Sequence, residues 1–578
     1  MLFSSFLLSL ALSSIATAKP CPILGPVFEA PTGLADSPVL KEAFEVLQAV
    51  LDNATETGQT PAGPWFGYKN NSIALTVFDT SDSEFFSYQY SSSVLQKASQ
   101  GVTKITEDAI FRIGSLSKLV SAYAWLIEAG PTYWDQPITK YIPELKKAAK
   151  KCSAADGPID CTDWDEITLG ALASHQAGIP RDYSTPAELL DPFSSVGGGE
   201  GAVALGLPPL PESALPPCGL GPTDACSIEQ WLAGIIAADP IYAPFSTPVY
   251  SNGGYIILAA AFERITGKST SDMVDGLFER LNMTQSSYSN PEGLDNAVIP
   301  LGVNSGYQAI LGIESPVGGY FSTQSDIAKL GRSILKSSEL SPAVTRQWMK
   351  PSIFTESTTA AVGMPWEIFR VPGLLNDHDF DLYTKTGDVL DYSSHLILSK
   401  EYNVGFGMLV AGNDTTTTRS LLAEVITPIL FPALEKIARA QAHEKYAGTY
   451  KSTGDVDFEV ELTTDAGKPG LRVVKFASNG TETFPGLDPE TTVLHLYPTN
   501  LIHATSESEY KIAYRAVSDK KGNDPSLGLF STGCENWFLV GATRYGGIDL
   551  DQIVFTVEDG KATTMAPRAW RRNLQKAD

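Results

Sequence analysis

The sequence is poor in the residues from which metal sites are built. Its 578 residues include only six histidines, which are scattered along the chain, and six cysteines, none of them in a Cys-x-x-Cys pair. Structural zinc sites need several such ligands at short spacings. We therefore predict no metal centre, and we expect no cofactor.

Basic runs and long apolar runs are also missing. Lysine and arginine number 42 against 66 acidic residues, the net charge is −24, and no Lys/Arg-rich helix stands out. This composition argues against nucleic acid or an anionic membrane as a partner. After the N-terminal residues, no stretch is long and apolar enough to span a bilayer. We expect neither nucleic acid nor membrane among the partners.

Residues 1–18 have the pattern of a secretory signal peptide. An apolar core at 6–12 is followed by Ala16-Thr17-Ala18, the small-x-small pattern of a cleavage site. The usual Lys or Arg before the core is missing. Small, Ser-rich residues follow the core directly, which favours a signal over a buried N-terminal strand or helix. We expect a secreted, extracellular protein.

The cysteines and the glycosylation sequons agree with this expectation. Two cysteine pairs each bracket a short Gly-, Pro- or Asp-rich segment, and the remaining two could join the ends of the chain: Cys152 with Cys161, Cys218 with Cys226, and Cys21 with Cys534. The sequence alone leaves the pairing open. Five Asn-x-Ser/Thr sequons are candidate glycosylation sites: Asn53, Asn70, Asn282, Asn413 and Asn479.

At 578 residues the chain is too long for one compact core, so we expect at least two domains. Residues 19–440 form the first, in which helices and short strands alternate from 106 onward. Within it, residues 183–249 are rich in proline and glycine. We expect an irregular insertion there, held by a disulfide. The pattern leaves open whether it lies beside a binding cleft or is a mobile surface loop.

A second, all-β domain is predicted at 445–578. Apolar and acidic residues alternate at 456–462, which is typical of a half-buried strand. Further strands are expected at 493–496 and 537–540, and residues 553–561 predict a hairpin with an Asp-Gly turn. Together these patterns indicate a small β-sandwich or β-barrel.

One tetrapeptide points to chemistry. Ser115 and Lys118 form a Ser-x-x-Lys sequence where an extended stretch ending in glycine gives way to an amphipathic helix. Residues three apart share a helix face, and a helix N-terminus favours developing negative charge. A serine needs a base to become a nucleophile, and a lysine can serve if burial or another cation lowers its pKa. The same spacing at Ser333, Ser508 and Ser518 lacks this setting.

Two further motifs follow in the same domain. Tyr250 and Asn252 form a Tyr-x-Asn triplet just before an apolar helix. Lys385, Thr386 and Gly387 form a Lys-Thr-Gly triplet in a predicted strand that ends in a glycine turn. Each triplet alone is common, but the order Ser-x-x-Lys, Tyr-x-Asn, Lys-Thr-Gly within one domain rarely arises by chance.

On these motifs the chain resembles the penicillin-recognising serine hydrolases, specifically the class C β-lactamase-like group with its D-aminopeptidase-like and esterase relatives. The resemblance covers roughly 60–440 and includes the segments 167–178 and 318–328. It implies an α/β (α+β) fold, in which helices flank an antiparallel sheet and a helical subdomain adjoins it. It also implies that His175, inside the first segment, belongs to a structural turn and forms no Ser-His pair.

The resemblance implies a role for each motif residue. Ser115 would be the nucleophile and Lys118 the adjacent base. Tyr250, near the two motif lysines, would have a lowered pKa, pass a proton to the leaving group and later activate water.

The other motif residues would bind the substrate. Asn252 would bond the acyl side chain. Lys385, on an edge strand, would hold a carboxylate or bias its neighbours' pKa values, with Thr386 and Gly387 lining the slot. The oxyanion hole would be the backbone N–H groups of the nucleophile and of Asp388.

Two departures from the family's pattern qualify the expected substrate. Asp388 stands where lactamase-like relatives usually carry a small residue, and its carboxylate is expected to repel anionic substrates. The insertion at 183–249 would reshape the site. We therefore predict a secreted serine hydrolase that forms an acyl-serine on an ester, amide or lactam, with a small molecule or short peptide as substrate. The alternatives are an acyltransferase that tailors a small metabolite and a non-catalytic extracellular binding protein.

Overall fold

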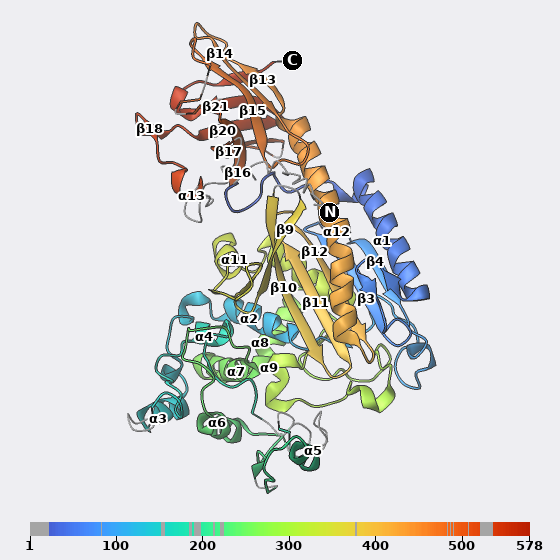
Figure 1. The fold of residues 1–578 in the computed structure, drawn as a ribbon. Coiled ribbons are helices and arrows are strands. Elements are labelled where there is room, and N and C mark those ends of the chain that lie inside the picture. The colour runs from blue at the N-terminus through green and yellow to red at the C-terminus, as the bar shows by residue number, and fades with distance from the viewer. Residues whose placement is uncertain are drawn as a thin grey trace, which may run out of the picture. The chain divides into compact units, whose positions relative to one another are not determined.

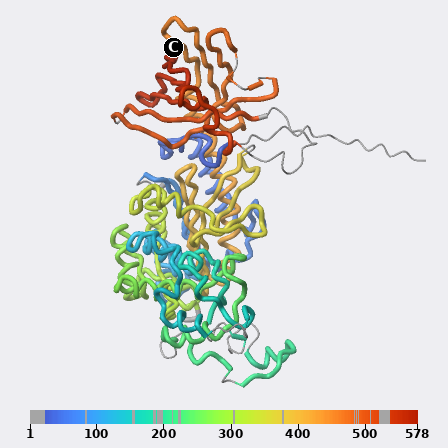
Figure 2. The backbone as a smooth tube through the Cα atoms, turned by 90° about the vertical axis from the view of Figure 1, so that its left-hand side faces the viewer, coloured from blue at the N-terminus to red at the C-terminus, as the bar shows by residue number. Residues whose placement is uncertain are grey.

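We describe a computed structural model of the chain (Figure 1, Figure 2). The structure describes residues 22–81, 84–151, 157–183, 188–189, 198–211, 214–219, 225–375, 378–482, 484–485, 487–488, 490–506, 508–520 and 536–577. The chain divides into two compact units. One comprises residues 33–371 and 381–431, and the other comprises residues 1–32, 372–380 and 432–578.

The first unit is built on an eight-stranded sheet with the order β4-β3-β12-β11-β10-β9-β8-β7. Its strands are β3 (Ser72–Asp79), β4 (Glu84–Tyr90), β7 (Ile353–Phe354), β8 (Ala360–Val362), β9 (Glu367–Leu375), β10 (His378–Val389), β11 (Tyr392–Ser399) and β12 (Val404–Ala411). Strands β3, β12, β11 and β10 pair antiparallel. Strands β11 and β12 are buried along their whole length, because helices cover both faces of the sheet (Figure 1).

The two faces of the sheet carry different helices, and β11 shows this residue by residue. Ser394 bonds the Ile113 carbonyl, just before helix α2, whereas its neighbour Ser393 bonds Thr415 at the start of α12. Successive side chains of a strand point to opposite faces. The helices that cover the sheet are α2 (Leu116–Glu128), α10 (Gln324–Lys336) and α12 (Thr415–Tyr446). The face that meets α2 therefore carries Lys385 and Gly387, which pair with Leu396 and Ser394 of β11.

A helical region completes this unit. Its helices are α3 (Pro143–Lys151), α4 (Leu169–Ala173), α7 (Asn252–Thr266), α8 (Thr270–Arg280), α9 (Ser315–Gly318) and α11 (Pro342–Trp348). Helices α4, α8 and α9 pack on α2 or α7. The rings of Trp125, in α2, and Phe262, in α7, have centroids 5.4 Å apart in the same core. The predicted fold class, helices against an antiparallel sheet with a C-terminal β domain, is confirmed.

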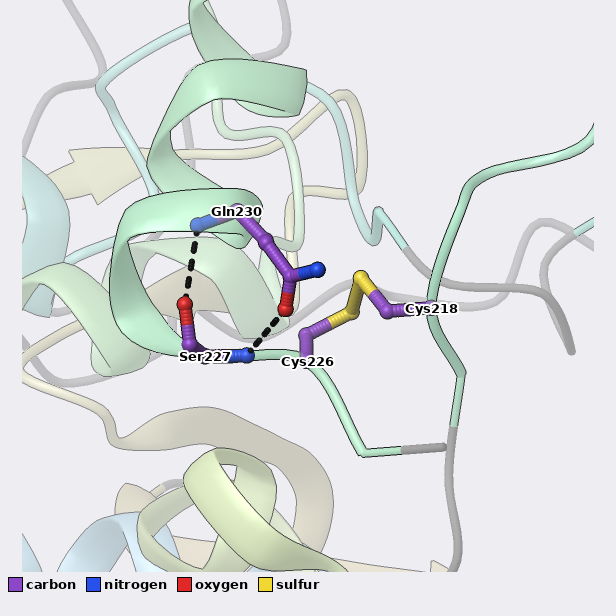
Figure 3. The surroundings of a disulfide bond; sticks show 4 residues. All are labelled: Cys218, Cys226, Ser227 and Gln230. Carbon is purple, nitrogen blue, oxygen red and sulfur yellow. Dashed lines mark hydrogen bonds between the residues drawn. A yellow bond between two sulfur atoms is a disulfide. The ribbon is translucent and has the colours of Figure 1, made fainter. Parts of the chain in front are cut away.

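The insertion at 183–249 is more regular than expected. Its described part contains α5 (Gly199–Ala204) and α6 (Ile228–Ala237). The Cys218–Cys226 disulfide stands just before α6, where Ser227 and Gln230 form a reciprocal capping box (Figure 3). The predicted Cys218–Cys226 pairing is confirmed. Cys161 is also disulfide-bonded, whereas Cys152, Cys21 and Cys534 lie outside the described residues.

The second unit contains a closed barrel of eight strands, drawn in orange to red in Figure 2. Its strands are β13 (Gly448–Lys451), β14 (Phe458–Thr463), β15 (Leu471–Ser478), β16 (Thr492–Ala504), β17 (Glu509–Lys520), β20 (Gln552–Glu558), β21 (Lys561–Pro567) and β22 (Leu574–Lys576). The predicted Asp559-Gly560 hairpin joins β20 to β21, and both turn residues have positive φ, 47° and 79°. Such angles match the twist of a hairpin.

One predicted strand is wrong. Residues 537–540 do not extend a sheet, because Asn536–Leu539 forms the short helix α13. Trp537 and Phe538 are each 71% exposed. A short apolar run without alternation does not distinguish strand from helix. None of the helices in the described residues combines the length and apolar character needed to cross a bilayer.

A carboxylate holds the N-terminal segment to the barrel unit. The Glu29 side chain accepts hydrogen bonds from one ammonium and three phenols: Lys445, Tyr446, Tyr510 and Tyr514. Tyr446 and Tyr514 belong to the aromatic core of the barrel, together with Phe555. Burial of these phenols is tolerated because the carboxylate accepts hydrogen bonds from their hydroxyls.

We predict that Glu29→Ala lowers the free energy of unfolding of the barrel unit by about 1–3 kcal/mol, because it leaves three phenols and an ammonium without their acceptor. Urea unfolding followed by far-UV circular dichroism measures the change. Glu444→Ala, which removes an exposed carboxylate of the same unit, is the control and should stay close to wild type. An equal, small effect of both substitutions would contradict the assigned role of Glu29.

Candidate active site

Ser115 stands at a strand-to-helix turn that exposes its hydroxyl. The short strand β5 (Phe111–Arg112) leads into Gly114, whose φ of 51° lies in the left-handed region. Ser115 is the N-cap of α2, and the residues 116–126 that follow are buried. Glycine adopts the left-handed conformation at little cost. The turn therefore leaves Ser115 partly accessible at the start of a buried helix.

Lys118 lies one helical turn after the serine and is fully buried. Its Nζ donates to Ser115 Oγ at 3.0 Å and to the Val317 carbonyl, in α9, at 2.7 Å. Burial lowers the pKa of Lys118, and the charge of Lys385 lowers it further, against an opposing effect of Tyr250. A neutral amine in hydrogen-bond contact with a serine hydroxyl is chemically able to take its proton.

Tyr250 lies between the two motif lysines. Its ring centroid is 5.0 Å from Lys118 Nζ and 5.5 Å from Lys385 Nζ. Burial raises the pKa of Tyr250, but the two ammonium charges and hydrogen bonds with Lys118 and Ser115 outweigh it, so the pKa is lowered overall. The three motifs, far apart in the sequence, thus meet around one phenol.

The turn that contains His175 positions Tyr250. The His175 backbone has a φ of 58°, and its carbonyl accepts from the Val249 N–H at 2.7 Å. The His175 ring stacks on Tyr250 with centroids 4.4 Å apart, and its Nδ1 accepts from the Ser251 N–H at 3.2 Å. Burial holds the pKa of His175 well below its usual value. His175 is a neutral packing partner of the tyrosine, as the structural interpretation of this turn expects.

Lys385 is buried and tied to a carboxylate that the sequence motifs did not reveal. Its Nζ donates to Glu367 Oε1 and, at 2.7 Å, to the Thr386 carbonyl. Burial lowers the pKa of Lys385, but Glu367 outweighs this and raises it overall. The expected edge position is wrong, because β10 lies between β11 and β9 inside the sheet.

The Lys-Thr-Gly glycine allows β10 to pass the start of α2. A Cβ at Gly387 would lie 2.0 Å from the Ile113 carbonyl oxygen, and a Cβ at Gly114 would lie 2.6 Å from Asp388 N. The predicted turn at Gly387 is wrong, because the strand continues to Val389. The close approach brings Asp388 N beside the turn that carries Ser115.

The side chain of Asp388 is not directed at the site. Ser393 and Thr416 donate to its Oδ1 at 2.6 and 2.8 Å, and Arg419 contacts Oδ2 at 3.2 Å. These partners lie on the α12 face of the sheet. The expectation that this carboxylate repels anionic substrates is therefore wrong, because the carboxylate points to the opposite face of the sheet, where it pairs with Arg419.

Asn252 is fixed by two charged residues that the motifs did not include. Its Nδ2 donates to Asp182 Oδ1 at 2.6 Å, and Arg181 Nε pairs with Asp182 Oδ2 at 3.3 Å. The Arg181 guanidinium lies 4.9 Å from the Tyr250 centroid. Only Ile179 and Pro180 separate Arg181 and Asp182 from the 167–178 segment. That closeness is the signal that would have found them. Glu367 carries no sequence signal.

The described site therefore contains three cations and two carboxylates around the serine. Lys118 and Lys385 are enclosed, whereas the Arg181 side chain is 66% exposed. Within the described part of the chain, no three His, Cys, Asp or Glu side chains are arranged to hold a metal ion.

Comparison with known proteins identifies the family of the chain. A beta-lactamase family model matches residues 54–430. The chain belongs to the beta-lactamase family. A second model, described as a beta-lactamase-like C-terminal domain, matches residues 438–578. The fold is that of a beta-lactamase-like hydrolase, and the resemblance found in the sequence is confirmed.

Individual relatives are distant in sequence. A "Beta-lactamase-like protein" of Arthroderma benhamiae is 28% identical over 96% of each chain. A "Probable hydrolase M10" of a Phoma species is 26% identical, over 78% of this chain and 71% of the relative. A class C beta-lactamase solved with cefoxitin is 17% identical with a TM-score of 0.47, over 67% of this chain and 98% of the other.

We predict that Tyr250 ionises at lower pH than an ordinary tyrosine and that Lys385→Met raises its pKa. Positive charges favour the phenolate, so removing one shifts ionisation upward in pH. The ionisation of Tyr250 is measured by pH titration of tyrosinate absorbance. Each protein is titrated with and without the Tyr250→Phe substitution, and the difference between the two curves is the titration of Tyr250. Lys400→Met, at a half-buried lysine in the turn between β11 and β12, should leave this difference unchanged. An unchanged or lowered pKa in Lys385→Met would refute the proposed coupling.

Proposed function

We propose that this protein is a serine hydrolase that forms an acyl-enzyme on Ser115. The observation that carries the proposal is the 3.0 Å contact between Lys118 Nζ and Ser115 Oγ, made by a buried amine. A lysine with a lowered pKa has a neutral fraction at a pH where an ordinary lysine has almost none. That fraction is able to act as a general base.

In the acylation step, Ser115 Oγ attacks the substrate carbonyl carbon while Lys118 Nζ takes the hydroxyl proton. The carbonyl oxygen becomes an oxyanion that accepts hydrogen bonds from the backbone N–H groups of Ser115 and Asp388. Losing one such donor typically raises a barrier by about 2.7–4 kcal/mol. The near approach of β10 to Gly114 supports this pairing of donors.

Collapse of the tetrahedral intermediate breaks the bond to the leaving group. The proton now on Lys118 passes through the Tyr250 hydroxyl to the leaving atom, which departs neutral. In deacylation, water attacks the acyl carbonyl carbon. The Tyr250 oxygen takes a proton from this water as its own hydroxyl proton passes to Lys118. Return of a proton to Ser115 Oγ releases the acid and restores the site.

We propose a small ester, amide or lactam, or a short peptide, as substrate, with no membrane or nucleic-acid partner. The second N–H of the Asn252 amide remains for the acyl group, since the first is given to Asp182. We also propose that the protein is secreted and glycosylated. The Cys218–Cys226 disulfide and the exposed Asn53, Asn282, Asn413 and Asn479 support this.

We predict that a fluorophosphonate probe labels wild-type protein once and that Ser115→Ala abolishes the label, because only an activated serine attacks the phosphorus. Intact-mass spectrometry measures the adduct. Ser333→Ala, at the buried serine of the second Ser-x-x-Lys spacing, keeps it. Folded wild-type protein that takes no label would favour the binding-protein alternative.

We predict that Lys118→Ala and Tyr250→Phe each lower kcat/KM for an acetate ester by about 10²–10⁴, the range typical of general acid–base groups. Both variants should keep the far-UV spectrum of wild type. Lys140→Ala and Tyr545→Phe, at exposed positions, serve as matched controls and should remain within about twofold of wild type. Rates near wild type for either site variant would remove its residue from the proton path.

A further inference from the structure

Glu367 fills the corner of the site that the Lys-Thr-Gly motif forms. Its Oε1 accepts from Lys385 Nζ and, at 3.0 Å, from Thr386 Oγ1. Its Oε2 accepts from the Thr386 backbone N–H at 2.9 Å. The ammonium expected to hold a substrate carboxylate, and the hydroxyl expected to line the slot, are therefore already bound by a carboxylate of the chain.

The accessible charge at this corner is negative. The Lys385 side chain is 1% exposed, whereas the Glu367 side chain is 27% exposed. An approaching group therefore meets the carboxylate before it meets the ammonium. Displacing Glu367 would break three charge-assisted hydrogen bonds and leave its carboxylate partly buried, which is costly.

The other cations of the site offer no replacement for Lys385. Lys118 is fully buried and donates to Ser115 and to the Val317 carbonyl. Arg181 is exposed, but it pairs with Asp182, which also holds Asn252 on the side proposed for the acyl group. An anionic leaving group thus meets the partly exposed Glu367 carboxylate on one side. On the other side it meets Arg181, which is already paired with Asp182.

We infer that the Ser115 site acts on esters or amides whose leaving group carries no carboxylate, and that Glu367 excludes those that do. The inference rests on the proposed function, since it concerns the leaving group of the same acylation step. Placing like charges side by side is a common device of specificity and is strongly unfavourable when the charges are partly desolvated.

Two acetate esters test the inference: 3-acetoxybenzoate and its isosteric amide, 3-acetoxybenzamide. Both deliver the same acetyl group to Ser115, so their ratio of kcat/KM reports only the leaving group. Wild type should favour the benzamide ester by at least about tenfold. Glu367→Gln keeps the size of the side chain and removes its charge, and should reduce this preference at least about fivefold.

The matched control is Asp381→Asn, which removes a carboxylate that pairs with Arg370 elsewhere on β10. It should leave the preference unchanged. The salt dependence of the preference between the two esters, measured on wild type, is a further test that does not require a variant to fold. The preference should narrow as sodium chloride rises from 0.05 to about 0.5 M, because salt screens partly exposed charges.

Three results are decisive. Equal or faster turnover of 3-acetoxybenzoate by wild type overturns the inference but leaves the serine hydrolase intact. A preference unchanged in folded Glu367→Gln also overturns it. Absence of turnover of both esters together with absence of fluorophosphonate labelling of Ser115 overturns the proposed function and this inference with it.

Discussion

The burial of the Lys118 amine beside Ser115 is the constraint on which the site depends. An ammonium without access to water is unfavourable unless its hydrogens are bonded. Here Ser115 Oγ and the Val317 carbonyl accept two of them. The third lies toward Tyr250, whose pKa falls in response. The left-handed Gly114, the close passage of β10 and the docking of α9 all serve to keep this one amine enclosed and aligned.

The same two lysines show how environment separates chemically identical groups. Lys118 and Lys385 are both enclosed, and both lie about 5 Å from the Tyr250 ring. Only Lys385 has a carboxylate, Glu367, within hydrogen-bond reach, and its pKa is raised while that of Lys118 is lowered. One lysine thus stays charged and the other is able to give up its proton. Titratable groups whose pKa values are pushed apart in this way usually divide the acid and base roles of a site.

How much the sequence predicts depends on whether the physical cause is local. Ser115 and Lys118 are three residues apart, so helical periodicity alone places them together, and the Asp559-Gly560 hairpin follows from its turn residues. The position of β10 inside the sheet depends on pairing with β9 and β11, which no local pattern contains. The position of Glu367 beside Lys385 depends on the same strand pairing, so the sequence did not reveal it. The repulsion assigned to Asp388 was wrong because strand alternation turns that side chain to the α12 face.

The position of Glu367 also bears on how this site could diverge from a carboxylate-binding one without a change in its motifs. In the proposed mechanism the three motifs supply the nucleophile, the proton path and the oxyanion donors, and these requirements are common to any acyl transfer through serine. The identity of residue 367 instead decides which charge faces the leaving group. Because Glu367 bonds Thr386 through both its hydroxyl and its backbone N–H, it also fixes β9 against β10. A substitution of Glu367 that changed selectivity would therefore also have to replace its hydrogen bonds with Thr386. Selectivity for the leaving group and the attachment of β9 to β10 thus depend on the same side chain.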